Sequence, residues 1–181
     1  MIEGGTLVLG VGSPLMADDG LGVEAVGTLS ARWEESADLH FVDGGVWGML
    51  VMPHIDAADR LLIIDVIRTG DEPGTLIRLE RDEIPLHLRT KLSPHQIDLS
   101  EVLALAELRG TFPPEAVALG IEPARVEAYE GLSPPVRKTV PALLEAVERQ
   151  LEAWGHQLRP LPPASEHRKA AAAHRKAAAR A

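Results

Sequence analysis

Short apolar runs alternate along the chain with stretches of helical periodicity. Four runs predict strands, most of them apolar enough for burial on both faces of a sheet, at residues 6–11, 39–42, 61–66 and 116–121. Four stretches have the spacing of helices, at residues 20–33, 47–58, 97–108 and 136–154. Strands that alternate with helices predict an α/β fold, a single three-layer domain whose twisted, mostly parallel sheet has helices on both faces.

Three local features refine this prediction. Residues 75–80 alternate apolar and polar positions after the turn sequence TGDEPG, which predicts one antiparallel hairpin strand at the edge of a sheet of about five strands. Pro53 falls inside the second helical stretch and predicts a kink or break there. In the third helical stretch, the stripe expected to face the core consists of Val102, Leu105 and Leu108.

Charge divides the chain into two parts. Residues 1–158 contain 12 Lys and Arg against 26 Asp and Glu, a formal net charge of −14, whereas residues 159–181 carry a net charge of +5. We therefore expect residues 1–158 to form the α/β domain and residues 159–181 to be a basic, alanine-rich tail, mobile or a detached helix. The acidic body argues against nucleic acid as a partner.

Composition limits the chemistry further. The sequence has no cysteine, which excludes disulfides, thiolate-bound zinc, a cysteine nucleophile and iron–sulfur clusters. Its N-terminal stretch does not have the pattern of a signal peptide or of a membrane span. We expect a cytoplasmic protein that acts away from membranes, with an aliphatic core because aromatic residues make up only 3% of the chain.

The first strand leads into the loop GVGSPLMADDG, which begins as a nucleotide-binding loop does. Leu15 occupies the position of the third glycine in the dinucleotide fingerprint, and the loop has no lysine to make it a P-loop. Two carboxylates, Asp18 and Asp19, stand where a phosphate would be expected. A nucleotide site stays open as an alternative because Asp43 ends the second strand, where an acid can bind a ribose.

Asp18 and Asp19 have two further interpretations. Either one can cap the helix that follows, which requires a single acid. Two of them at the carboxyl edge of a parallel sheet, where ligands bind in such folds, suggest a cation. Asp65 ends the strand LLIIDV at the same edge and His95 precedes the third helix, although each can also be structural. Carboxylates with an imidazole suit nickel, zinc or cobalt.

Several blocks of sequence, taken together and in order, resemble the maturation endopeptidases of nickel–iron hydrogenases. They extend from about residue 7 to residue 147 and read GVGSPLMADDGLGV, DGGVWGM, LLIIDVIRTGDEPGT, LSPHQIDLSEVLALAELRG, FPPEAVALGIEP and YEGLSPPV. By this resemblance the metal-contacting residues are Asp19, Asp65 and His95. Ser13 departs from the family pattern, which usually has asparagine after Gly-x-Gly.

The resemblance implies an endopeptidase that removes a short C-terminal extension from the hydrogenase large-subunit precursor after nickel insertion. The substrate supplies the nickel, and no other cofactor is expected. Either the metal polarises the scissile carbonyl or activates a water, or one of the catalytic candidates Asp19 and Asp65 serves as a general base. The amides of Gly44 and Gly45 are expected to position the substrate chain.

Two other functions fit the same residues. The chain can be a non-catalytic assembly factor that binds nickel or the precursor, or a nucleotide-binding module. In either case, as for the protease, we expect a monomer.

Overall fold

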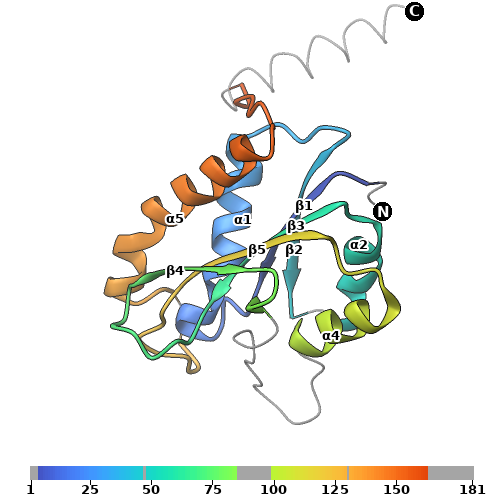
Figure 1. Cartoon of the computed structure of the whole chain (residues 1–181). Helices are drawn as coiled ribbons and strands as arrows, with labels where there is room; N and C mark the ends of the chain where they lie inside the picture. Colours follow the sequence, from blue (N-terminus) through green and yellow to red (C-terminus); the bar gives the residue numbers. More distant parts are fainter. Residues whose placement is uncertain (1–3, 47, 85–98, 130, 163–181) are drawn as a thin grey trace, which may run out of the picture.

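In the computed structural model, which describes residues 4–46, 48–84, 99–129 and 131–162, five strands form one sheet in the order β2-β1-β3-β5-β4 (Figure 1). The strands are β1 (Thr6–Val11), β2 (Leu39–Gly45), β3 (Arg60–Val66), β4 (Leu76–Glu80) and β5 (Glu115–Ile121). Neighbouring strands are parallel except for β4, which runs antiparallel to β5 at the edge. The predicted α/β fold with one antiparallel strand is confirmed.

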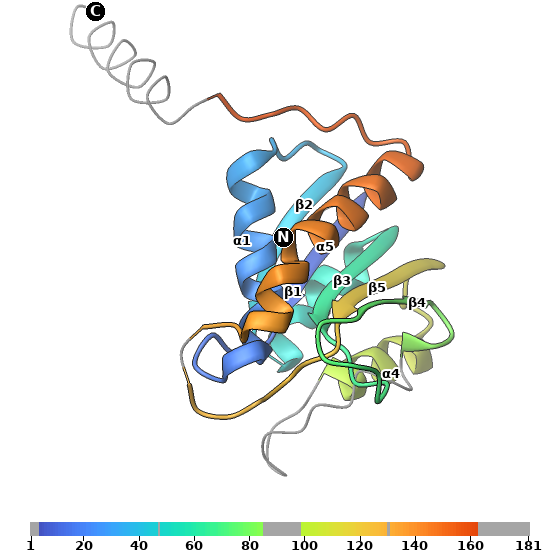
Figure 2. The same cartoon turned by 90° about the vertical axis from the view of Figure 1, so that its left-hand side faces the viewer.

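Helices cover both faces of the sheet, as predicted (Figures 1 and 2). One face carries α1 (Leu21–Arg32) and α5 (Pro134–Ala153), and the other carries α2 (Met52–Ala57) and α4 (Leu99–Arg109). Two short 3-10 helices, η1 (Ala17–Gly20) and η2 (Gly48–Val51), follow β1 and β2. The predicted break near Pro53 lies where η2 ends and α2 begins. Pro53 is in the first turn of α2, where proline is tolerated.

The apolar runs are unbroken because the central strands are covered on both sides. Leu7 and Leu9 of β1 point into the core beneath α2 and α4, whereas Val8 points into the core beneath α1 and α5. Leu62 and Ile64 of β3 share the second core with Val8. This alternation gives every residue of these runs an apolar environment, which a strand with one solvated face does not have.

The antiparallel strand differs from its prediction in its partner. β4 forms no hairpin with β3, because β5 lies between the two in the sheet. Beyond the paired strands, the amide of Gly74 donates to the carbonyl of Glu122 and the amide of Glu122 donates to the carbonyl of Thr75, each at 2.9 Å. The turn sequence therefore takes the chain beyond the position that β5 occupies in the sheet. The chain then runs back as β4 along the outer side of β5.

The buried stripe of α4 also differs from its prediction. Its buried residues are Val102, Leu103 and Ala106, whereas Leu108 is 84% exposed and Leu105 is half-buried. Three residues turn an α-helix by about 300°, so a stripe of every third residue drifts away from any fixed face. The residues of α4 that pack on the sheet are instead separated by one, three and four positions, as Val102, Leu103 and Ala106 are.

Two glycines bring α1 unusually close to the sheet. A Cβ on Gly22 would lie 2.2 Å from the carbonyl oxygen of Ile64 and 2.3 Å from that of Val11. A Cβ on Gly10 would lie 2.2 Å from the carbonyl oxygen of Gly22. The absence of side chains here lets the start of α1, and the loop before it, lie directly against the carboxyl ends of β1 and β3.

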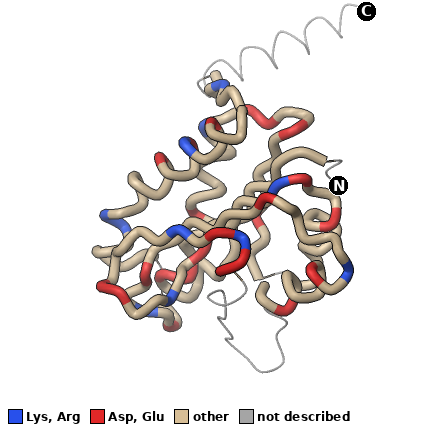
Figure 3. Tube along the Cα trace, viewed as in Figure 1, with Lys and Arg blue, Asp and Glu red and all other residues tan. Residues whose placement is uncertain are grey.

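The described chain ends beside the other end of α1. The amide of Leu161 donates to the carbonyl of Arg32 at 2.8 Å, and the amide of Glu34 donates to the carbonyl of Arg159 at 2.9 Å. The rest of the predicted basic tail, residues 163–181, lies outside the described residues. Figure 3 shows the positions of acidic residues distributed along the trace, with basic residues among them. Within the described part of the chain, no helix has the length and apolar character needed to cross a membrane.

Candidate active site

Two acids meet at the carboxyl edge of the sheet. Asp19 lies in η1 after β1, and Asp65 is the penultimate residue of β3, which pairs with β1. Both are almost fully buried, with exposures of 3% and 7%. They are close enough for the charge of Asp19 to raise the pKa of Asp65. The structure thus brings together the two carboxylates that the sequence singled out, here called the acid pair.

Burial sets the protonation of the acid pair. It raises the pKa of Asp65 well above the usual value, the charge of Asp19 raises it further, and a hydrogen bond from the amide of Val66 at 2.7 Å acts in the opposite direction. Burial also raises the pKa of Asp19, against the amide of Ser13 at 2.7 Å and the guanidinium of Arg68. Two such acids resist ionising together, so protonation of one of them or a nearby cation favours the acid pair.

Asp18 has a different role from its neighbour. Its carboxylate accepts hydrogen bonds from the amides of Ala124, Arg125 and Ser133 and from the Ser133 hydroxyl, at 2.6–3.0 Å. The N-cap residue of α1 is Gly20, and neither α1 nor η1 has a side-chain cap. The helix-capping interpretation is therefore wrong for both acids: Asp18 fixes the segment between β5 and α5 against η1, and Asp19 belongs to the acid pair.

The loop after β1 holds a carboxylate where a nucleotide-binding loop would hold a phosphate. The amide of Ser13, which such a loop would offer to a phosphate, donates to Oδ2 of Asp19. Gly12 has a φ of +112°, and a Cβ on it would lie 1.8 Å from the carbonyl oxygen of Asp19. In a nucleotide-binding loop, glycine lets a phosphate come close to the backbone. Here the carbonyl of Asp19 occupies that space beside Gly12, which argues against the nucleotide alternative.

Gly44 and Gly45 are the last two residues of β2, and the amide of Gly45 already has a partner. The amide of Gly45 donates to Oδ1 of Asp43 at 2.9 Å, so it is already used within its own turn. This hydrogen bond argues against the expectation that the Gly45 amide positions a substrate, whereas that expectation stays a prediction for Gly44. Asp43 is exposed and caps that turn, which is the structural alternative to a ribose-binding role.

Sequence reasoning missed Glu122, the buried acid that shapes the loop after β3. Its Oε2 accepts hydrogen bonds from the amides of Thr69 and Gly70 and from the Thr69 hydroxyl, at 2.7–3.1 Å. These contacts hold the segment next to Arg68, the cation that acts on Asp19. The signal was available, because Glu122 follows the apolar run of β5 just as Asp65 follows that of β3.

The third predicted metal contact cannot be placed. His95 lies outside the described residues, and no group of three or more histidine, aspartate or glutamate side chains able to hold a metal ion forms among the residues that are described. Within that part of the chain, the acid pair has no third metal-ligating side chain beside it.

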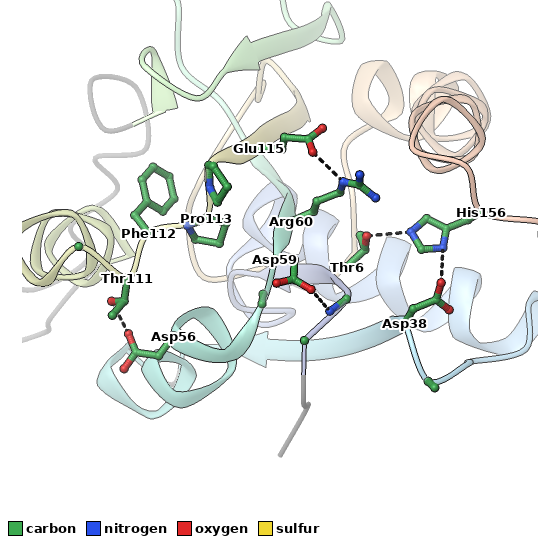
Figure 4. Close-up of a pocket in the computed structure, with 16 residues that line it drawn as sticks. Thr6, Asp38, Asp56, Asp59, Arg60, Thr111, Phe112, Pro113, Glu115 and His156 are labelled. Atoms are coloured by element: carbon green, nitrogen blue, oxygen red, sulfur yellow. Dashed lines mark hydrogen bonds and ion pairs between the residues drawn. The ribbon is translucent and has the colours of Figure 1, made fainter.

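A cavity of about 800 Å³ lies at the opposite end of the strands from the acid pair, where β1, β3 and β5 begin (Figure 4). Its polar side chains are engaged with one another or with nearby backbone. Asp59 accepts from the amide of Gly5 at 2.7 Å, Arg60 donates to Glu115 at 2.9 Å, and His156 lies 2.8 Å from the Thr6 hydroxyl. This network of satisfied contacts stabilises the base of the sheet, and it lacks the electrostatic conflict that marks the acid pair.

Comparison with known proteins gives a consistent result. The family model for hydrogenase maturation protease matches residues 23–150. The hydrogenase expression/formation protein HupD of Rhizobium leguminosarum is 38% identical over 169 residues, covering 89% of this chain and 84% of HupD. The hydrogenase 2 maturation protease of Escherichia coli is 34% identical over 155 residues, covering 85% and 94% of the two chains.

Solved structures agree with these sequence matches. The hydrogenase maturating endopeptidase HybD from E. coli superimposes with a TM-score of 0.79 at 34% identity, covering 86% of this chain and 97% of HybD. The fold and the acid pair define a mixed-sheet α/β protein with a buried carboxylate site at the carboxyl edge. This chain belongs to the hydrogenase maturation protease family.

Proposed function

We propose that this chain is an endopeptidase that removes a short C-terminal extension from the precursor of a nickel–iron hydrogenase large subunit after nickel insertion. The observation that carries the proposal is the acid pair, two buried carboxylates at the edge of the sheet where α/β proteins bind ligands. Family membership supports protease activity, and the name of the E. coli relative supports a hydrogenase as the client.

In this proposal the acid pair recognises nickel that the precursor carries. Asp19 and Asp65 offer oxygen ligands, and His95 offers a nitrogen ligand, a donor set that suits a borderline divalent ion. A cation beside the acid pair would favour the ionised form of both carboxylates, which burial alone disfavours. Nickel is thus part of the substrate, and a precursor without nickel lacks the group that makes binding at this edge favourable.

Two routes to hydrolysis share this geometry. In the first, nickel polarises the scissile carbonyl or activates the attacking water. In the second, the ionised member of the acid pair accepts a proton from the attacking water, and a proton passes to the amine that leaves with the extension. In both routes water adds across one peptide bond, and in both Asp65 is required, either as a ligand or as a member of the acid pair that provides the base.

A cleavage assay tests the proposal. The purified chain is mixed with nickel-loaded or metal-free large-subunit precursor, and loss of the C-terminal peptide is followed by mass spectrometry. Asp19→Ala and Asp65→Ala are the test variants. Asp43→Ala is the matched control, because it removes an exposed carboxylate at the same edge of the sheet that is not part of the acid pair.

We expect cleavage of the nickel-loaded precursor only, by the unsubstituted chain and by Asp43→Ala, with loss of activity in both test variants. Full activity of Asp65→Ala would contradict both routes. Tight binding of several nickel-loaded precursors without any cleavage would instead favour a non-catalytic assembly factor that uses the same acids for docking.

A further inference from the structure

Exposed apolar side chains gather on the loops around the acid pair. Among the described residues, seven large hydrophobic residues are exposed, and five of them lie in the segments that follow β1, β2 and β5 at the carboxyl edge: Leu15, Val46, Met49 and Leu50 of η2, and Tyr129. Single exposed apolar residues are common on protein surfaces, but their concentration on neighbouring loops marks an interaction site.

Backbone hydrogen bonds join two of these loops into one ridge. The amide of Tyr129 donates to the carbonyl of Leu15 at 3.1 Å, and the amide of Ala17 donates to the carbonyl of Tyr129 at 2.7 Å. Leu15 is 67% exposed and Tyr129 is 54% exposed. We call these two residues the Leu15–Tyr129 ridge. Because Asp18 fixes the same two segments with four hydrogen bonds, the ridge is held in place before any partner binds.

The third loop lies beside the ridge segment. Gly45, the residue before Val46, accepts a hydrogen bond at its carbonyl from the amide of Gly12 at 2.9 Å. Gly12 in turn borders Asp19, whose carbonyl fills the space next to it. The segment that carries Val46 is therefore tied to the loop that carries Asp19, which places the exposed apolar residues next to the acid pair.

A small pocket adjoins the ridge. A cavity of about 220 Å³ is lined by Pro14, Ala17, Gly20, Val23, Glu24, Gly131 and Leu132. Pro14 is next to Leu15 in the chain, and Gly131 is two residues beyond Tyr129. Its lining is mostly aliphatic, so it accepts an apolar side chain of a partner that lies across the ridge.

Arg125 adds a positive charge to this surface of an otherwise acidic body. Its guanidinium stacks on the ring of Tyr129 at 4.0 Å, with a long ion contact of 3.8 Å to Glu127. Its Nε is buried and has no hydrogen-bond partner among the described residues. A carboxylate that approached the ridge would meet a pre-oriented guanidinium, which is the donor best suited to carboxylate recognition.

We propose that the Leu15–Tyr129 ridge and the pocket beside it dock an apolar segment of the large-subunit precursor, and that Arg125 receives a carboxylate of that segment. The inference rests on the proposed function. It assigns substrate binding to a surface separate from the acid pair, so docking and the recognition of nickel are different contributions to specificity.

The test compares Leu15→Ser with Tyr129→Ser, alone and combined, against Leu108→Ser as the matched control. Leu108 is more exposed than either ridge residue, and it lies on α4 away from the loops of the acid pair. Binding of nickel-loaded precursor is measured by calorimetry in an Asp65→Asn background, which cannot cleave. KM and kcat are measured in the active background, and melting curves verify folding.

We expect the double variant to weaken binding and to raise KM by about tenfold or more, while kcat stays within about twofold and Leu108→Ser matches the unsubstituted chain. Leu15→Ser alone keeps the Arg125–Tyr129 stack and still weakens binding. Arg125→Gln weakens binding most for a precursor whose segment keeps its acidic residue. Binding and KM equal to those of the control would overturn the inference.

The outcomes separate this inference from the proposed function. A chain that binds precursor through the ridge but never cleaves it would retain the docking surface and sink the protease proposal. Normal cleavage by the double variant, with unchanged KM, would leave the protease and overturn the ridge. Sedimentation of the chain alone is measured in parallel, and a dimer that the double variant splits would assign the ridge to a second copy, which also overturns the inference.

Discussion

The carboxylate of Asp18 binds Ser133 across 115 residues of sequence, accepting its amide at 2.6 Å and its hydroxyl at 2.9 Å. Two more amides, of Ala124 and Arg125, complete the set of donors. From the described part of the chain, the side chain of the neighbouring Asp19 accepts one hydrogen bond, from the amide of Ser13. Asp18 and Asp19 are neighbours in sequence and both are buried, but their roles differ. The carboxylate of Asp18 is surrounded by hydrogen-bond donors, whereas that of Asp19 lies near the carboxylate of Asp65.

This contrast predicts different effects for the same substitution. Asp18→Ala leaves the buried amide and hydroxyl of Ser133 and two part-buried amides without their acceptor, and should lower the free energy of unfolding by about 3 kcal/mol. Asp19→Ala loses one hydrogen bond but relieves a buried charge, and should change it by less than about 1.5 kcal/mol while cleavage is lost. Urea denaturation at neutral pH measures both, and equal destabilisation by the two variants would contradict the assignment.

Asp65→Asn should stabilise the fold at neutral pH. Folding raises the pKa of Asp65 above the ordinary 3.8, so as the pH rises past that value the unfolded chain loses this proton before the folded chain does. Stability therefore falls with rising pH until the folded group has ionised too, and asparagine has no proton to lose. Unfolding measured at about pH 4 and about pH 7.5 should show the gain at the higher pH and little at the lower. A variant less stable than the parent at both would count against a buried, uncompensated acid.

Gly22 and Gly27 of α1 allow the same substitution to be compared at a position packed against the sheet and at an open one. Gly22→Ala places a methyl group 2.2 Å from the carbonyl of Ile64, so the helix must shift, and we expect a loss of more than about 2 kcal/mol with reduced cleavage. Gly27→Ala meets no atom within 4 Å and should stabilise the helix by about 0.5–1 kcal/mol. Thermal melting of both variants tests the close approach, and an unchanged melting temperature for Gly22→Ala would disprove it.

His156 should make the fold sensitive to mild acid. Burial lowers its pKa below the ordinary 6.5, Asp38 opposes this and Arg60 adds to it. Below pH 6.5 the unfolded chain takes up this proton before the folded chain does, so the stability is present above that pH and is lost as the pH falls through the folded pKa. His156→Gln keeps a polar partner for the Thr6 hydroxyl and should flatten this loss.

Denaturation curves between about pH 7.5 and about pH 5 measure the difference between the two proteins. Burial lowers the pKa of His54 as well, so the variant retains part of the slope, and the difference curve isolates His156. Parallel curves would show that His156 is protonated as readily in the folded chain as in the unfolded one.

Local patterns in the sequence predicted the fold well. The apolar runs of β1, β3 and β5 and the long stripe of α5 were predictable because burial on a strand or helix leaves a period of its own in the sequence. The errors came where the pattern depended on a partner far along the chain. The alternation of β4 identifies an edge strand but not the strand it pairs with, and the period of α4 was too weak to choose between neighbouring faces.

The sequence by itself also singled out the two members of the acid pair as candidates, since Asp65 ends one apolar run and Asp19 lies in the loop that follows another. What only the tertiary structure decided is which acid does what. The local pattern does not distinguish Asp18 from Asp19, because their donors and neighbours come from segments up to 115 residues away. Glu122 and the Leu15–Tyr129 ridge likewise acquire their roles from contacts between distant loops. Local periodicity records whether a residue is buried, but hydrogen-bond partners and neighbouring charges are set by the packing of the whole chain.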